Sequence, residues 1–143
     1  MTTISVAPRR MHQSAAQFAL GMTLLDVQLA LLHSESNPIE KAERQRVGAL
    51  IGFFHQALVA LRWATDQRVI IPRMRDYEVG LLVMQYFGAE ERLGDSDVMR
   101  RIGRVASSLV ALKRHGRVEP KTRQELLTLL RAMEHFVDRQ LLY

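Results

Sequence analysis

The stretch SAAQFALGMTLLDVQLALLH, residues 14–33, decides the fold class of this chain. Its apolar residues recur every three or four positions, which is the period of an α-helix, and they do not alternate as they would in a β-strand. Ser14 is a favourable N-cap, so a helix is predicted from Ser14 to about His33. Because most sides of this helix are apolar, we expect it to be the central helix of the fold. Its apolar residues form two stripes, one of Phe18, Leu25, Leu29 and Leu32 and one of Leu20, Leu24, Val27 and Leu31.

The same periodicity continues in the second predicted helix. Asn37 is its predicted N-cap, Pro38 occupies its first position, and Glu40 is a capping-box acid. The helix continues to about Arg68. Within it the pair Gly48 and Gly52, four residues apart on one ridge, predicts close packing against another helix inside the bundle. Its predicted core-facing residues are Val47, Leu50, Ile51, Phe54, Leu58 and Leu61.

Three further helices complete the predicted fold, after an extended connector at residues 69–72. Their predicted bounds are about Met74 to Phe87, ending at Gly88; Asp95 or Ser96 to Gly116; and Pro120, or Thr122 with Glu125 completing a capping box, to the C-terminus. A chain of 143 residues has the usual size of one domain. The sequence therefore predicts an all-α fold, a compact bundle of about five helices in a single domain spanning residues 1–143, with residues 1–13 as a candidate flexible N-terminal arm.

The composition excludes several classes of protein. The chain has no cysteine, which excludes disulfides, thiolate metal sites and cysteine nucleophiles and is typical of a reducing compartment, so a cytoplasmic location is expected. The uncharged stretch 47–61 is shorter than the ~20 apolar residues that span a bilayer, so no transmembrane helix and no membrane partner are expected. Arg9 and Arg10 precede the apolar run 15–25 as in a signal peptide. Since Gln17 interrupts this run and Asp26 ends it, an uncleaved first helix is expected.

Positive charge is concentrated in one segment of the chain. Residues 92–123 contain nine basic and three acidic side chains, whereas residues 1–91 contain nine of each and residues 124–143 contain two basic and three acidic ones. The net charge of +5 therefore comes from residues 92–123. Most of the basic residues are arginine, whose forked donors suit phosphate oxygens. Such asymmetry is typical of a protein that binds a polyanion.

A helical projection of the segment from Asp95 separates a basic face from an apolar one. Arg100, Arg104 and Arg114 share the basic face with small residues, and Arg101 lies at its flank. Small side chains between arginines allow a phosphate backbone to approach closely. The predicted nucleic-acid-binding residues on this face and the turn after it are Arg100, Arg101, Arg104, Lys113, Arg114, Arg117, Lys121 and Arg123. Two alternatives stay open for this surface: a site for a protein partner, and an ordinary solvated face.

No sequence-specific reader and no catalytic motif accompanies this basic face. There is no helix-turn-helix with a tight turn, no zinc-finger spacing, no Gly-rich phosphate loop and no serine elbow. Arg131 precedes His135 by three residues, whereas HEPN ribonucleases have four to six residues between the arginine and the histidine. The five histidines are scattered and lack ligand spacing. We therefore expect no enzyme activity, no catalytic residue, no metal and no cofactor.

In size, helicity and basic surface the chain resembles the small helical subunits of CRISPR effector complexes, a resemblance of class that rests on no motif. It implies a non-catalytic accessory subunit that contacts the phosphate backbone of RNA or single-stranded DNA within a larger assembly, beside other protein subunits. The rival hypothesis is a protein-binding helical module, such as a secretion chaperone, an assembly adaptor or a phage-encoded inhibitor. Its signature would be an exposed apolar groove around Gly48, Gly52 and Trp63. An oligomer is compatible with both hypotheses.

Overall fold

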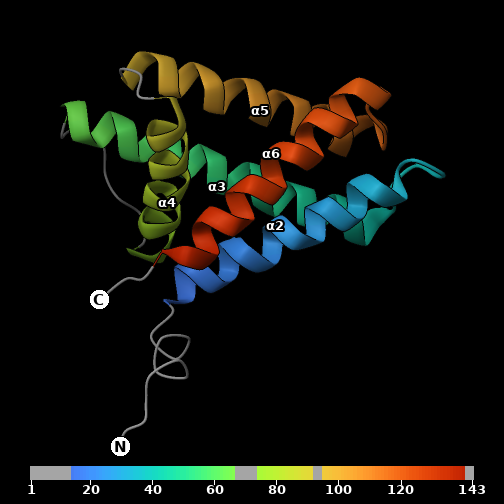
Figure 1. Cartoon of the computed structure of the whole chain (residues 1–143), viewed down its shortest axis with the longest axis horizontal. Coiled ribbons are helices and arrows are strands. Elements are labelled where there is room, and N and C mark those ends of the chain that lie inside the picture. The colour runs from blue at the N-terminus through green and yellow to red at the C-terminus, as the bar shows by residue number, and fades with distance from the viewer. Residues whose placement is uncertain (1–13, 67–73, 92–94, 141–143) are drawn as a thin grey trace, which may run out of the picture.

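The computed structural model describes residues 14–66, 74–91 and 95–140. Over these residues the protein is a compact all-α bundle without strands, as the sequence predicts (Figure 1). The described helices are α2 (Ala15–His33), α3 (Lys41–Asp66), α4 (Met74–Glu91), α5 (Asp95–His115) and α6 (Pro120–Arg139). The predicted arm at residues 1–13 and the predicted connector at residues 69–72 lie outside the described residues.

The prediction that α2 is the central helix is wrong, because one side of α2 faces the solvent. Among the described helices, α4 packs against α2, α3, α5 and α6, whereas α2 packs against α3, α4 and α6 with one side only. Leu20 and Leu24 on that side are fully buried, while Phe18 and Leu29 of the other stripe are 59% and 58% exposed. The prediction failed because a helix that is apolar on nearly every side does not reveal which side faces the core.

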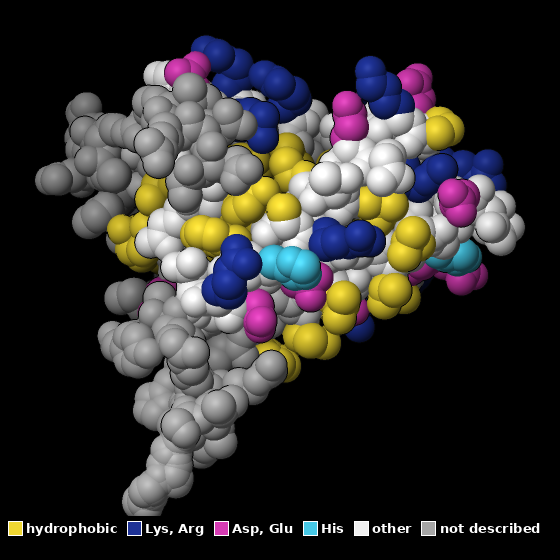
Figure 2. All heavy atoms as spheres, viewed as in Figure 1, with side chains coloured by type: hydrophobic (Ala, Val, Ile, Leu, Met, Phe, Trp, Pro, Cys, Tyr) yellow, Lys and Arg dark blue, Asp and Glu magenta, His cyan; other side chains and the backbone are white. Residues whose placement is uncertain are grey.

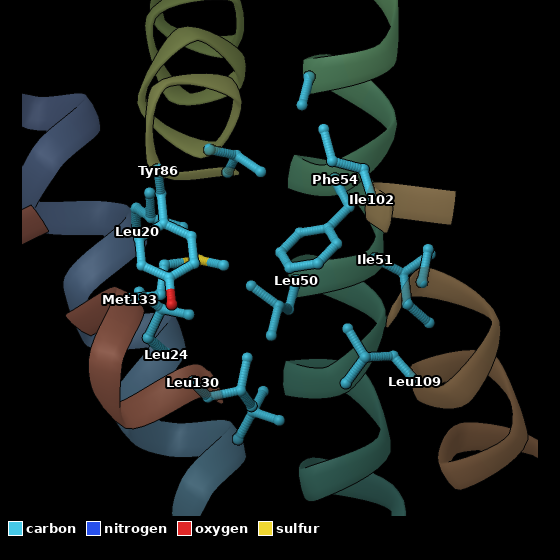
Figure 3. Close-up of a cluster of buried hydrophobic side chains, with 14 of the residues drawn as sticks. Leu20, Leu24, Leu50, Ile51, Phe54, Tyr86, Ile102, Leu109, Leu130 and Met133 are labelled. Atoms are coloured by element: carbon cyan, nitrogen blue, oxygen red, sulfur yellow. The ribbon is translucent and has the colours of Figure 1, made fainter. Parts of the chain in front are cut away.

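The hydrophobic core lies around Phe54, where α3 faces the other helices (Figure 3). Phe54 is fully buried, and its ring meets that of Phe87 edge to face, with the ring centroids 5.9 Å apart. Tyr86 extends this cluster to Phe87 at 5.3 Å and to Phe136 at 5.5 Å. Edge-to-face pairs contribute about 0.5–1.5 kcal/mol beyond the burial of their area. The aromatic cluster therefore joins α3, α4 and α6.

Helix α4 crosses α3 at Gly80. A Cβ atom on Gly80 would lie 2.5 Å from the backbone oxygen of Gln56 and 2.9 Å from the backbone nitrogen of Ala57. A Cβ on Gly52 would meet no atom within 4 Å, and the atoms nearest to one on Gly48 would belong to the Lys113 side chain. A neighbouring helix therefore reaches the backbone of α3 at Gly80 of α4. The predicted close packing is absent at Gly52, whereas Gly48 is covered by the Lys113 side chain of α5.

Several predicted helix ends are confirmed. Ser14 is the N-cap of α2, and its Oγ accepts a hydrogen bond of 3.0 Å from the backbone nitrogen of Gln17. α5 ends before Gly116, whose φ of +80° is a conformation that glycine adopts without strain. α6 begins at Pro120. α4 differs from the prediction because it continues through Gly88 to Glu91.

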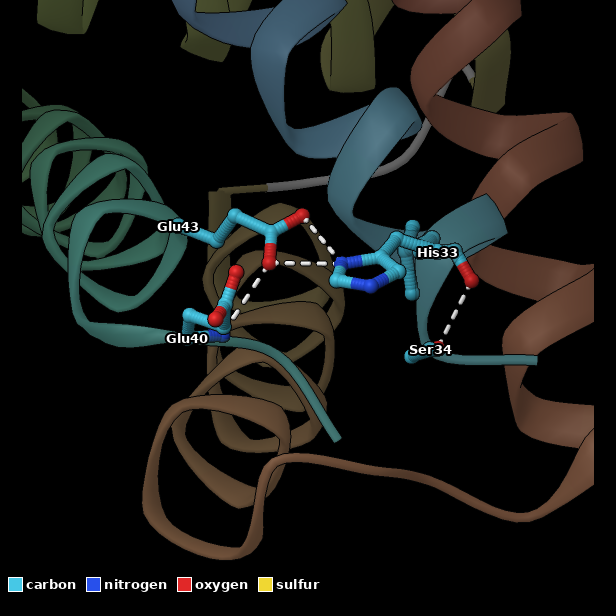
Figure 4. A network of polar contacts seen from close by, with 5 residues as sticks. His33, Ser34, Glu40 and Glu43 are labelled. Atoms are coloured by element: carbon cyan, nitrogen blue, oxygen red, sulfur yellow. Dashed lines mark hydrogen bonds and ion pairs between the residues drawn. The ribbon is translucent and has the colours of Figure 1, made fainter. Parts of the chain in front are cut away.

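The start of α3 also differs from the prediction, and contacts between helices explain why. Ile39 is buried, and its backbone nitrogen donates a hydrogen bond of 3.0 Å to the oxygen of Gly116, which holds the segment before Lys41 outside the helix. The capping-box contact forms three residues later than predicted, because the Glu43 carboxylate accepts from the backbone nitrogen of Glu40 at 3.0 Å. The same carboxylate lies 2.7 Å from Nδ1 of His33 (Figure 4). One side chain therefore ties the end of α2 to the start of α3.

Two buried amides attach α2 to α6. Nε2 of Gln17 donates to the backbone oxygens of Val137, at 2.7 Å, and of Gln140. Nε2 of Gln28 donates to the Glu134 carboxylate at 2.8 Å.

By length and composition alone α2 could cross a membrane, a property that the sequence prediction missed because it took Asp26 as the end of the apolar run. In the bundle, Gln17 and Gln28 of α2 are hydrogen-bonded to residues of α6 and its C-cap.

Candidate nucleic-acid interface

Helix α5 presents its predicted basic face to the solvent. Arg100, Arg104 and Arg114 are exposed, as is Ser107 between them, and Ala111 is half-buried. Figure 2 shows basic side chains along the upper edge of the molecule, where α5 lies in Figure 1. The structure thus brings three predicted arginines together on one outward face. The opposite side of α5 contributes buried residues to the core, namely Val98, Ile102, Ala106, Leu109 and Leu112.

The three arginines differ in how their charges are compensated. Among the described residues, Arg104 and Arg114 have no ion-pair partner. Arg100 lies 3.0 Å from the Asp97 carboxylate one turn earlier, and both side chains are well exposed. An exposed pair of this kind contributes at most a few tenths of a kcal/mol, so a phosphate group could displace the aspartate at little cost. All three guanidinium groups are therefore accessible to an anion.

Two arginines that follow α5, Arg117 in the turn and Arg123 in the first turn of α6, bind within the chain. Nη2 of Arg117 donates to the backbone oxygen of Ser36 at 3.0 Å. Nη2 of Arg123 lies 3.4 Å from the Glu35 carboxylate, and the Arg123 side chain is only 16% exposed. These contacts attach the α5–α6 turn and the start of α6 to the α2–α3 turn. Arg117 and Arg123 therefore have structural partners already, unlike Arg104 and Arg114.

Lys113 lies where the end of α5 packs on α3. Its side chain passes over Gly48, since a Cβ on that glycine would lie 3.0 Å from Nζ and 3.4 Å from Cε. Beside it, Nη1 of Arg44 donates to the backbone oxygens of Lys113 and, at 3.2 Å, of Arg114. These carbonyls belong to the last turn of α5, where a cation is stabilised by the helix dipole. The sequence carried no signal for Arg44, because it caps a helix about 70 residues later in the chain.

The two remaining predicted residues lie at the margins. Arg101 is half-buried at the flank of the basic face, where it lines a shallow hollow together with Tyr86 and Gln124. Lys121 is exposed in the first turn of α6 and has no ion-pair partner among the described side chains. Neither residue belongs to the line of Arg100, Arg104 and Arg114.

An open groove of about 670 Å³ lies beside the basic face, between α5 and α6. Arg104 belongs to its α5 wall, and Glu119 and Thr122 belong to its α6 side. The groove continues past Glu125 to an apolar part at Leu129. Figure 2 shows hydrophobic side chains exposed in the band between these two helices. The groove therefore joins a cationic wall, hydroxyl groups, an apolar floor and two carboxylates.

The sequence did not predict this groove. Thr122 and Glu125 formed a possible capping box, but α6 begins at Pro120 and its N-cap residue Glu119 makes no side-chain cap hydrogen bond. Instead, Thr122 and Glu125 line the groove. Helical periodicity identifies the faces of α5 and α6 separately, but it does not give the angle between the helices, and the groove depends on that angle.

The described residues contain no group of three or more His, Asp or Glu side chains that could hold a metal ion. Comparison of the chain with known protein families, with curated proteins and with solved structures found no match. The likeness to small subunits of CRISPR effector complexes therefore stays a prediction from size, helicity and charge.

Proposed function

We propose that this protein is a non-catalytic helical accessory subunit that binds the phosphate backbone of RNA or single-stranded DNA through α5. The observation that carries the proposal is the exposed line of Arg100, Arg104 and Arg114. At 1.5 Å per residue this line extends about 21 Å, a distance comparable to about six nucleotides at 3.4 Å per step. One strand could contact all three guanidinium groups.

The residues between the arginines support the same proposal. Ser107 is a short exposed hydroxyl, and Ser108 and Ala111 are half-buried, so a backbone could lie close to the helix surface. Arginine offers paired donors to phosphate oxygens, which holds the strand without reading its bases. Binding of this type is strongly salt-dependent and weakly selective for sequence.

Reversing the charge of the α5 face tests this proposal. The double variant Arg104→Glu/Arg114→Glu is expected to lose about 100-fold in affinity for a single-stranded oligonucleotide at low salt, because it replaces two phosphate contacts by repulsion. The measurement is fluorescence anisotropy with a labelled oligonucleotide. Both residues are exposed and have no ion-pair partner among the described residues, so the helical circular dichroism spectrum should stay unchanged.

The matched control is Arg131→Glu/Arg139→Glu, which changes the net charge equally at two exposed positions of α6. This control should retain most of the wild-type affinity. Equal losses in both variants would mean that binding follows net charge and not the α5 face. Absence of wild-type binding even at low salt would refute the proposal.

A second candidate, a protein-binding module, is favoured by the apolar floor of the α5–α6 groove. A groove with a half-buried Leu129 and flanking charges suits the apolar side of a partner helix. The two candidates differ in their response to salt, because apolar contacts persist at about 0.5 M salt whereas phosphate contacts weaken steeply. A partner that the immobilised wild-type protein retains at high salt, and that Leu129→Glu releases, would support the second candidate.

A further inference from the structure

The outward side of α2 carries a continuous line of large apolar side chains. Phe18, Met22, Leu25, Leu29 and Leu32 are 59%, 45%, 41%, 58% and 51% exposed. We call these five residues the α2 stripe. At about 200 Å² for a large side chain, they expose roughly 500 Å². A patch of this size is at the upper end for monomeric proteins and is typical of an interaction site.

The spacing of the α2 stripe indicates what it binds. The intervals between successive members are four, three, four and three residues. This is the spacing of a coiled-coil seam, whose side chains fit between those of another helix. The partner that this spacing fits is therefore a helix with an equivalent seam.

Three members of the stripe are arranged symmetrically, which suits pairing with a second copy of the chain. Leu25 stands at its centre, with Phe18 seven residues before and Leu32 seven residues after. In an antiparallel pair of α2 helices, Leu25 would meet its counterpart on a two-fold axis, and Phe18 would meet Leu32 of the second copy. Self-complementarity of one patch under a two-fold rotation defines an isologous dimer interface.

Polar contacts border the stripe on both sides. On the α3 side, Asp26 lies 3.7 Å from Arg46, so its charge is compensated. On the α6 side, Gln28 is hydrogen-bonded to Glu134. An apolar centre with a polar rim is the usual anatomy of a protein interface. The roughly 500 Å² of the stripe is less than the ~800 Å² that each subunit buries in a standard dimer, so the dimer would bury the polar rim as well.

We propose that the protein forms a two-fold symmetric dimer through antiparallel pairing of the α2 stripe. This proposal is independent of the proposed function of α5. α2 and α5 lie on opposite sides of the bundle in Figure 1, so the dimer would leave both α5 faces open. Two linked sites on one strand would bind more tightly than one through effective concentration.

Sedimentation equilibrium tests the dimer. The wild-type protein should show twice its chain mass of 16.4 kDa at micromolar concentrations. Leu25→Glu places two carboxylates on the two-fold axis and should weaken dimerisation at least about 100-fold, with an unchanged circular dichroism spectrum. Thr128→Glu introduces the same side chain at an exposed position of α6 and should remain dimeric. A wild-type protein that stays monomeric would overturn the proposal.

Because the chain has no cysteine, single cysteines can report the helix direction. Leu25→Cys should form an intermolecular disulfide under mild oxidation. Phe18→Cys should not, since in the antiparallel pair the two copies of this residue are about 21 Å apart. Crosslinking of both variants would indicate a parallel pair and contradict the proposed arrangement. A monomer that binds anionic phospholipid vesicles, with binding lost in Leu25→Glu, would assign the stripe to lipid and overturn the dimer.

Discussion

Replacing Gly80 with alanine is expected to lower the free energy of unfolding by about 2–3 kcal/mol. The new Cβ would lie 2.5 Å from the backbone oxygen of Gln56, and a backbone atom cannot rotate away as a side chain can. α4 would have to move outward from α3, which would loosen the contact between Phe54 and Phe87. Urea unfolding followed by circular dichroism measures the loss.

The matched control for this variant is Gly52→Ala on α3. A Cβ at Gly52 meets nothing within 4 Å, and alanine is favoured over glycine within a helix by about 1 kcal/mol. The same chemical change should therefore stabilise the protein at Gly52 and destabilise it at Gly80. Stabilisation at both positions would contradict the close crossing of α3 and α4.

Truncation of Phe54 to alanine is expected to cost about 3–5 kcal/mol. Phe54 is fully buried on α3, and its removal leaves a cavity and breaks the edge-to-face contact with Phe87. A small domain has only about 5–15 kcal/mol of stability in total. The variant should therefore unfold at a much lower urea concentration than the wild type.

Phe53→Ala is the natural comparison, because Phe53 is the adjacent residue and packs only partly against the core. It should cost less than about 2 kcal/mol, since its ring is already partly hydrated in the folded state. Equal losses at the two positions would contradict the orientation of α3 in which Phe54 faces the core and Phe53 lies at its edge.

The existence of the helices was predictable, whereas their arrangement was only partly so. Ser14, Gly116 and Pro120 mark helix ends through local geometry, which depends on neighbouring residues and is readable from sequence. The start of α3 was not readable, because it depends on the burial of Ile39 and on its hydrogen bond to Gly116, about 80 residues away. Local propensity for a cap at Asn37 was overridden by this tertiary contact.

The orientation of α2 shows the same limit. Both of its apolar stripes suit a core, and only the positions of α3 and α6 determine that Leu20 and Leu24 are buried and that Phe18 and Leu29 are exposed. For α5 the pattern was clearer, since one face carries arginines and the other carries aliphatic residues. The predicted exposure of Arg100, Arg104 and Arg114 is confirmed.

The rest of the predicted site required the fold. Arg117 and Arg123 are basic and follow α5 closely, so the sequence predicted that they would bind phosphate. In the structure, the α2–α3 turn lies close enough to bind both side chains. No periodicity in the sequence reports that proximity. Charge counting therefore identified the segment, and the structure reduced it to the face on which three arginines point outward.

The salt dependence of oligonucleotide binding tests this account most directly. If Arg104 and Arg114 contact phosphates, Arg104→Gln/Arg114→Gln should reduce the slope of log affinity against log salt concentration by about 1.4–1.8, at ~0.7–0.9 per contact. Arg131→Gln/Arg139→Gln should leave the slope unchanged. An unchanged slope in the α5 variant would contradict the proposal that this face binds nucleic acid.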